Sequence, residues 1–168
     1  PSLKYILPLC PDDVRIGAAE FKKFVEYRDA GTFSWVATST SCLVELIAGG
    51  GGGGGGRTSP PNGGSGGTSG QYVRKMVTGL SIGTAYAVVI GAGGGGGAAN
   101  VDGTAGSDST FATTTAVAKG GPKGEFEGTA SAASATGTGD LIIDGNVSLA
   151  VGGTSGTSGG DSVRGRSG

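Results

Sequence analysis

Residues 42–56 read Cys-Leu-Val-Glu-Leu-Ile-Ala followed by eight consecutive glycines, and this junction decides the fold. The stretch 42–48 is short, mostly apolar and rich in residues that favour β-structure, which is typical of a β-strand. It runs directly into Gly49–Gly56, with no polar turn between strand and glycines. The sequence therefore predicts a sheet whose strand leads straight into a glycine tract.

The same order of strand and glycines occurs twice more downstream. Residues 71–78 and 85–90 are predicted to form a strand pair joined by a turn at 79–83, and the second strand leads into Gly91–Gly97. The Thr- and Ala-rich residues 111–119 are predicted to form a further strand, which ends at a Gly-Gly-Pro sequence. This recurrence indicates that the tracts belong to the fold, because linkers usually separate domains.

The region before the first tract is more ordinary in composition. Phe33 and Trp35 alternate with small polar residues over 32–36, the period-two pattern of a half-buried strand. Between residues 17 and 28 the apolar spacing fits a short helix, while Phe-Val-Glu-Tyr at 24–27 fits a strand, and we expect a helix passing into a strand. Four aromatic residues are predicted to lie in the core: Phe33, Trp35, Tyr72 and Tyr86.

Near the C-terminal end, two apolar triplets flank a turn signal. Leu141–Ile143 and Val147–Leu149 are separated by Asp-Gly-Asn at 144–146, a typical hairpin sequence. From Gly152 onward the chain consists largely of Thr-Ser-Gly triplets. These features predict one more hairpin followed by a glycine-rich tail.

Long glycine tracts can be flexible linkers or ordered polyglycine II helices, and composition leaves both open. A helix of this type is left-handed and extended, with three residues per turn and a rise of about 3.1 Å per residue. Because glycine keeps its N–H and has no side chain, such helices can pack side by side and hydrogen-bond through their backbones. The triplets at 154–156 and 157–159 fit that period. We expect a lattice of this kind.

The predicted fold is all-β, a small antiparallel β-sandwich-like sheet with packed polyglycine II helices and glycine-rich loops. Three parts are expected: an attachment or assembly segment at 1–31, the glycine-rich β/polyglycine II module at 32–151, and a glycine/serine/threonine-rich tail at 152–168. The net charge is −1. Glycine accounts for 39 of the 168 residues, which leaves few apolar side chains for a core. We therefore expect partners, such as copies of the same chain.

The residue inventory argues against an enzyme. The chain contains no His, so a Ser-His-Asp triad cannot form. The strand leading into Gly91–Gly96 matches a dinucleotide-binding pattern, but any polyglycine run satisfies it and no amphipathic helix follows. We predict no catalytic residues and no cofactor.

The sequence also gives little support for a cation site, a membrane segment, a reactive cysteine pair or a nucleic-acid surface. Asp140 and Asp144 could bind a cation, although carboxylates of a solvated turn are the more frequent explanation. No apolar run approaches the ~20 residues needed to span a bilayer, and no secretion signal is recognised, so we predict no membrane insertion. Cys10 and Cys42 are interpreted as reduced, partly buried thiols. The basic residues of the later half are too sparse for a nucleic-acid surface: Lys119, Lys123, Arg164 and Arg166.

Three stretches together resemble a known module. They are GTFSWVATSTSCLVELIAGGGGGGGG at 31–56, GGTSGQYVRKMVTGLSIGTAYAVVIGAGGGGG at 66–97 and GTGDLIIDGNVSLAVGG at 137–153. The chain over residues 24–168 is similar to the glycine-rich module of bacteriophage tail fibres and tail-tip proteins. Within the second stretch, Thr78-Gly79-Leu80, Gly83-Thr84 and Tyr86 match the family pattern.

The resemblance implies a virion adhesin whose loops contact a bacterial surface polysaccharide or an outer-membrane protein. The implied contact loops are 57–62, 98–107 and 121–128, with a partner in other virion fibre proteins. The alternative is a self-assembling fibril subunit, extracellular or on the virion; an ice-binding protein fits less well, because regular Gly-x-x repeats do not run throughout. Six residues are the candidate receptor contacts: Arg57, Pro60, Asn62, Asn100, Asp102 and Lys123.

Overall fold

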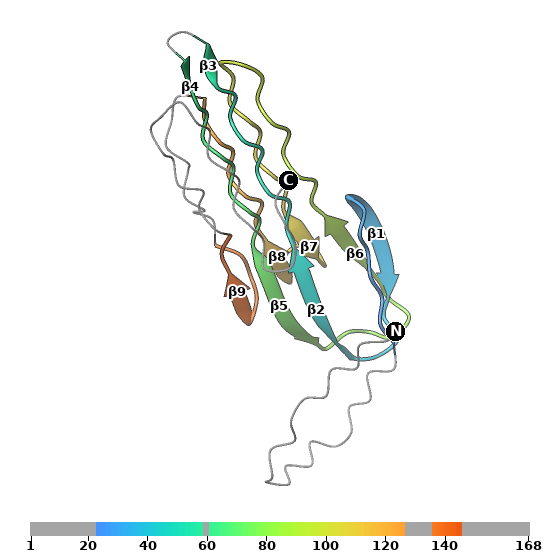
Figure 1. Ribbon diagram of the computed structural model, residues 1–168. Helices are drawn as coiled ribbons and strands as arrows, with labels where there is room; N and C mark the ends of the chain where they lie inside the picture. The colour runs from blue at the N-terminus through green and yellow to red at the C-terminus, as the bar shows by residue number, and fades with distance from the viewer. Residues whose placement is uncertain (1–22, 59–60, 127–135, 146–168) are drawn as a thin grey trace, which may run out of the picture.

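The apolar runs of the sequence form β-strands at one end of the molecule, and glycine-rich stretches extend from them to the other end (Figure 1). The computed structural model describes residues 23–58, 61–126 and 136–145. Within these ranges the regular secondary structure consists of β-strands alone, which confirms the all-β class. We call the strand-rich end the base, and the end formed by residues 56–58, 61–62 and 98–101 the tip.

Two antiparallel sheets form the base, and the strands expected over 32–36 and 42–48 are confirmed as the first two. One sheet has the order β1-β6-β7-β8: Gly31–Val36, Ala85–Ile90, Ser109–Phe111 and Ala116–Ala118. The other has the order β2-β5-β9: Ser41–Ile47, Tyr72–Thr78 and Leu141–Ile143. At the tip, β3 (Arg57–Thr58) pairs with β4 (Pro61–Asn62).

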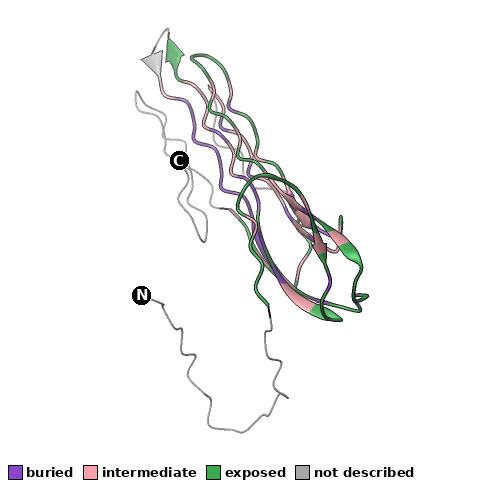
Figure 2. Ribbon diagram, turned by 90° about the vertical axis from the view of Figure 1, so that its right-hand side faces the viewer, coloured by how far each residue is buried: buried purple, intermediate pink, exposed green. Residues whose placement is uncertain are grey.

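The hydrophobic core lies where the two sheets pack on each other, and its buried residues appear purple in Figure 2. Val73 of β5 is fully buried, and Phe111 of β7 is 4% exposed. The Phe111 ring lies 5.8 Å from Trp35 and 6.0 Å from Tyr86, measured between centroids. The sandwich-like arrangement is thus confirmed. So are the core aromatics: Phe33, Trp35 and Tyr86 pack against the core, and Tyr72 is buried.

The strands expected over 71–78 and 85–90 exist as β5 and β6, but the pairing predicted between them is wrong. β5 pairs with β2 and β9, whereas β6 pairs with β1 and β7 in the other sheet. The connection crosses between sheets, with φ of 75° at Gly79 and 83° at Gly83 and with Leu80 buried in the core. Burial of Leu80 favours the crossing over a local hairpin.

The single strand predicted over 111–119 is also wrong, because β7 and β8 are separate strands joined by a turn. Ala112 and Thr113 have φ of 46° and 61°, and the reversal places Phe111 opposite Ala116. Alanine and β-branched residues seldom adopt positive φ, so the sequence carries no turn signal at this point.

Residues 23–28 are the described part of the predicted N-terminal helix and strand, and they form neither. Phe24 is 84% exposed, so little burial supports regular structure there, although the Tyr27 ring stacks on Phe33 at 4.8 Å. Of the hairpin predicted around 144–146, the first strand is β9. Its second strand, the Thr-Ser-Gly triplets and Cys10 lie outside the described residues.

The first glycine tract is the centre of a bundle of extended segments. Its N–H groups donate to backbone carbonyls of two neighbouring segments, 64–71 and 101–108, and the donors to each neighbour are three residues apart. The donor and acceptor pairs, at 2.8–3.0 Å, are Gly51–Thr68, Gly54–Ser65, Gly49–Ser107, Gly52–Thr104 and Gly55–Val101. The tract therefore contacts each of these neighbours once every three residues.

The carbonyl groups of the tract accept from two further segments, 91–98 and 119–126. These donor and acceptor pairs, all at 2.8 Å, are Gly94–Gly50, Gly97–Gly53, Gly121–Gly49 and Gly124–Gly52. A β-ladder would repeat every two residues, whereas these bonds repeat every three, as in polyglycine II. The predicted packing of the tracts as a lattice is confirmed, and the flexible-linker alternative is not.

Glycine is required in the tract because the neighbouring backbones approach closely. A Cβ at Gly49, Gly52 or Gly55 would lie within 3.0 Å of backbone atoms in segment 91–98, a separation that real Cβ atoms essentially never show. At Gly53 the nearest atom to an added Cβ would be 3.6 Å away, an ordinary contact. The requirement therefore follows the positions that face a neighbour.

The surrounding segments keep glycine mainly at every third position and carry other residues between. In segment 64–71, Ser65 and Thr68 are buried and each donates its hydroxyl hydrogen to a backbone carbonyl of segment 119–126, at 3.2 Å. The glycines of these segments at which a Cβ would lie within 3.0 Å of backbone are Gly64, Gly67, Gly70, Gly91, Gly94, Gly97, Gly103, Gly106, Gly120, Gly121 and Gly124. The lattice therefore extends well beyond the two long glycine runs.

Ser109 joins the sheets to the lattice, and its removal is expected to be costly. Its fully buried hydroxyl accepts from the N–H of Gly91 at 2.9 Å and donates to the carbonyl of Ile47 at 2.7 Å. Ser109→Ala leaves both backbone groups unpaired, so we expect a loss of about 2–4 kcal/mol in unfolding free energy by urea titration. Ser107→Ala removes an exposed side chain two residues away and should change stability by less than about 0.5 kcal/mol. Equal effects would contradict this role of Ser109.

Candidate functional site at the tip

The tip is held together by backbone and by one asparagine. Arg57 and Asn62 are opposite each other in the β3–β4 ribbon. Asn100 donates its backbone N–H to the Gly56 carbonyl, and its side-chain oxygen accepts from the N–H of Thr58 at 3.1 Å. The Asn100 amide also donates to Thr58 Oγ1 at 3.1 Å, and its φ of 60° suits asparagine. The turn at 98–101 is thereby fixed against the ribbon.

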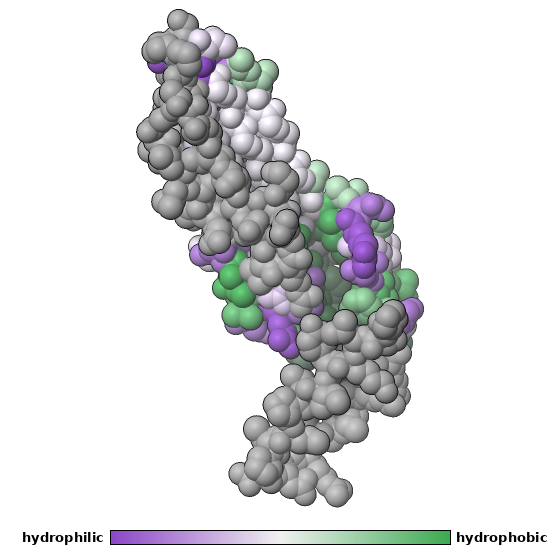
Figure 3. Space-filling view, in the orientation of Figure 1, coloured by the Kyte–Doolittle hydropathy of each residue, from purple (hydrophilic) through white to green (hydrophobic). Residues whose placement is uncertain are grey.

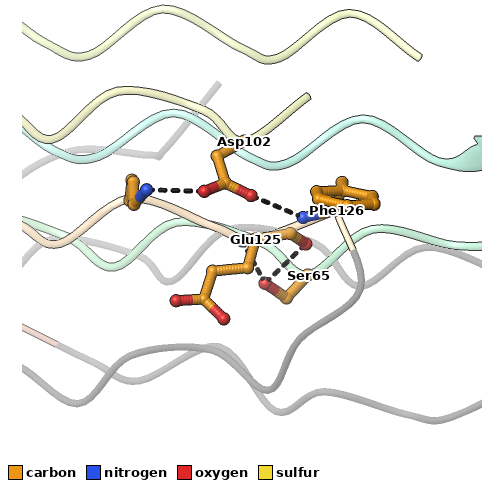
Figure 4. Close-up of polar contacts among 5 residues, drawn as sticks. Ser65, Asp102, Glu125 and Phe126 are labelled. Atoms are coloured by element: carbon orange, nitrogen blue, oxygen red, sulfur yellow. Dashed lines mark hydrogen bonds and ion pairs between the residues drawn. The ribbon is translucent and has the colours of Figure 1, made fainter. Parts of the chain in front are cut away.

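An ion pair joins two lattice segments just below the tip. Lys123 Nζ contacts Asp102 Oδ2 at 2.5 Å, and the N–H of Phe126 donates to Asp102 Oδ1 at 3.0 Å (Figure 4). Beside them, Ser65 Oγ accepts from the Glu125 N–H at 2.7 Å. Asp102 thus joins segments 101–108 and 119–126 at their tip ends.

The charges of this pair stabilise each other. The hydrogen bond from Lys123, followed by that from the Phe126 N–H, lowers the pKa of Asp102 below its ordinary value. The hydrogen bond to Asp102 raises the pKa of the Lys123 ammonium. Both side chains therefore remain charged at neutral pH and beyond it on either side.

A second ion pair joins the same two segments near the base. Lys119 Nζ contacts Asp108 Oδ2 at 2.8 Å, and the N–H of Gly120 donates to Asp108 Oδ1 at 2.9 Å. Burial of Asp108 would raise its pKa, but the hydrogen bonds from Lys119 and Gly120 lower the pKa on balance. The two pairs are chemically matched and differ in their distance from the tip.

The structure brings the sequence-predicted contact residues together only in part. Arg57 pairs with Asn62 in the ribbon at the tip, and Asn100 bonds to the neighbouring Thr58. Asp102 pairs with Lys123 just below the tip, while Pro60 lies outside the described residues. The loops expected at 98–107 and 121–128 are largely lattice segments, because their glycines face the central tract. Thr58 and Phe126 lie within the predicted loops 57–62 and 121–128 but were not singled out as contact residues; a lone aromatic next to a glycine-rich stretch was the available signal for Phe126.

The two carboxylates considered for a cation have protein donors. Asp140 Oδ2 accepts from the N–H of Met76 at 2.8 Å, and this bond, opposed by burial and aided by Lys75, lowers the pKa of Asp140. Asp144 Oδ1 accepts from Gln71 Nε2 at 2.6 Å. Asp140 therefore serves the sheet of the base, and Asp144 serves the junction between base and lattice. Cys42 is half-buried, and that burial raises the pKa of its thiol.

Surface hydropathy differs between base and tip. In Figure 3 the lattice is near white and the apolar colour gathers over the base. Among the described residues, Val101 is the one large apolar side chain exposed at the tip, at 53%. The exposed large apolar side chains of the base are Val36, Ile47, Met76, Ile82, Leu141 and Ile143. In the described ranges no helix has the length and hydropathy to cross a membrane.

Acid is expected to destabilise the protein through three aspartates. The pKa values of Asp102, Asp108 and Asp140 lie below the ordinary 3.8, so their stabilising effect is complete above about pH 5 and is lost as the pH falls through the folded-state values. We expect the melting temperature, measured by circular dichroism between pH 7 and pH 2.5, to decrease at pH values below about 4. A variant with Asn at all three positions should show a flatter profile, and an unchanged profile would contradict these assignments.

Comparison with known proteins adds one finding. A family model described as a glycine-rich domain matches residues 28–168, which include the nine strands and the lattice segments of the described residues. No curated protein matches the chain, and no solved structure matches it.

Proposed function

Because the chain belongs to the glycine-rich domain family, we propose that it is a non-catalytic structural protein of a bacteriophage virion, a tail-fibre-type adhesin that binds a host-cell receptor through its tip. The resemblance of residues 31–56 and 66–97 to tail-fibre modules supports the virion assignment. Other fibre proteins or copies of the chain are the proposed partners of the base.

The observation that carries the proposal is how the tip is supported. Segments 48–56, 64–71, 91–98, 101–108 and 119–126 are cross-linked by backbone hydrogen bonds with a period of three, and they run between base and tip. Such a lattice fixes side chains at the end of a narrow rod without a large core. Preorganised polar groups on a rigid support lose little conformational entropy on binding.

Adsorption to cells tests the proposal. The labelled protein is incubated with a panel of bacterial strains, and the bound fraction is measured for the parent chain and for Arg57→Ala/Asn62→Ala. We expect saturable binding to some strains and a loss of about tenfold or more in the tip variant. Ile82→Ser, at the exposed turn of the base, should bind like the parent. Equal loss in both variants would contradict a receptor site at the tip.

The apolar base favours a second candidate, a self-assembling fibril subunit. Val36 and Ile82 are 51% and 66% exposed, and β1 is an edge strand without charged residues or proline. Unprotected edges pair with other chains. Electron microscopy over a concentration series separates the candidates, since filaments of indefinite length would support the fibril and discrete particles the adhesin.

A further inference from the structure

We infer that the tip ligand is a hydroxyl-rich polysaccharide of low charge density, held by Phe126 together with the Asp102–Lys123 pair. The inference rests on the proposed adhesin function and adds the class of receptor and a contact residue. The three residues come from two lattice segments and are brought together by the hydrogen bond between the Phe126 N–H and Asp102.

Phe126 supplies an apolar surface in a polar setting. Phe126 is half-buried and its N–H is bonded to Asp102. Its ring lies beside that carboxylate in Figure 4. An aromatic ring offers an apolar face at low conformational cost, which suits the C–H face of a pyranose. A neighbouring ion pair can then bond the hydroxyls at the edge of the same sugar.

The Asp102–Lys123 pair is suited to hydroxyl recognition. The side chains are 32% and 43% exposed, so acceptor and donor positions remain accessible to solvent. A carboxylate accepts and an ammonium donates, and a sugar hydroxyl can do both. Charge-assisted bonds are the stronger class of hydrogen bond. A single exposed pair of this kind contributes little to folding, so removing it alone should leave the rod folded, whereas acid neutralises Asp102, Asp108 and Asp140 together.

The charge and hydropathy of this end favour a sugar over the alternatives. Arg57 and Lys123 are balanced by Asp102 and Glu125, so the described tip residues present no excess of positive charge for a polyanion. Protein interfaces usually contain a larger apolar or aromatic centre than the described residues of this end offer, since their large apolar side chains are the half-buried Phe126 and the exposed Val101.

The matched ion pair provides the control. The full chain is tested on arrayed bacterial O-antigen and capsular polysaccharides, and on outer-membrane vesicles whose sugars have been destroyed by periodate. We expect binding to a polysaccharide, lost about tenfold or more in Asp102→Ala/Lys123→Ala and in Phe126→Ala. Asp108→Ala/Lys119→Ala removes the same chemistry near the base and should bind like the parent, as should Phe24→Ala.

The outcomes separate the inference from the proposed function. Binding to periodate-treated vesicles but to no polysaccharide overturns the sugar assignment and leaves the adhesin. Binding to neither overturns both. Polysaccharide binding that the two ion-pair variants lose equally overturns the assignment of the site, provided that circular dichroism shows both variants folded.

Discussion

Gly52→Ala is expected to destabilise the protein by about 3 kcal/mol or more, enough to unfold a marginal rod. Gly52 is buried in the lattice, where its N–H donates to Thr104 at 2.9 Å and its carbonyl accepts from Gly124 at 2.8 Å. An added Cβ would lie within 3.0 Å of the backbone of Gly95. Backbone cannot move aside as a flexible side chain can, so segments must separate and lose hydrogen bonds.

Gly53→Ala is the matched control in the same tract. The nearest atom to its added Cβ would be the Ser65 carbonyl oxygen at 3.6 Å, and extended φ and ψ angles suit alanine. Because alanine also restricts the unfolded chain, we expect a change between zero and about 1 kcal/mol of stabilisation. Thermal and urea unfolding measure both variants. If Gly52→Ala and Gly53→Ala unfold alike, the close approach at Gly52 does not exist.

Phe111→Ala is expected to cost about 3–5 kcal/mol, the second large effect. Phe111 is 4% exposed in β7 and contacts the rings of Trp35 and Tyr86. With few large side chains in the molecule, the core has little to refill the cavity. Loss of this ring should also disturb the sheet from which the lattice segments extend, and near-ultraviolet circular dichroism should report the disordered Trp35.

Phe24→Ala removes the same side chain from a site that is 84% exposed. We expect its free energy of unfolding to lie within about 0.5 kcal/mol of the parent value. A small effect of Phe111→Ala would mean that the aromatic cluster is not the centre of the core and that the lattice alone sustains the fold.

Local sequence patterns predicted the strands but not their partners. Alternation at Phe33 and Trp35, and the apolar run before Gly49, were sufficient to locate β1 and β2. The assignment of β5 and β6 to different sheets depends on long-range burial, including that of Leu80, which no turn signal contains. The turn at Ala112 and Thr113 could not be predicted for a related reason. Tertiary packing imposes a left-handed backbone conformation there that these residues disfavour.

The lattice was predictable where glycine is continuous and harder to predict where it recurs every third residue. The run at 49–56 pointed to polyglycine II, but 98–107 was predicted as a loop because Ala, Asn, Val, Asp, Thr and Ser stand among its glycines, and no structure was predicted for 64–70. A search for glycine with a period of three would have found Gly64, Gly67 and Gly70.

The candidate site could be predicted as a set of polar loop residues, without their geometry. Asn100 and Thr58 are far apart in sequence and are hydrogen-bonded because the segment before Asn100 runs along the central tract that leads to Thr58. The pairing of Asp102 with Lys123 follows from the alignment of two lattice segments, which only the three-residue register defines. That register could not be read from either segment alone.

Amide hydrogen exchange across the first glycine tract, resolved by residue in NMR spectra, tests the central claim that these glycines form an ordered lattice. The N–H groups of Gly51, Gly52, Gly54 and Gly55 are bonded, while among the described residues those of Gly50 and Gly53 have no acceptor. We expect slow exchange at the first four and faster exchange at Gly50 and Gly53, a pattern with a period of three. Uniformly fast exchange, as in a flexible linker, or an alternation every two residues, as in a β-ladder, would contradict it.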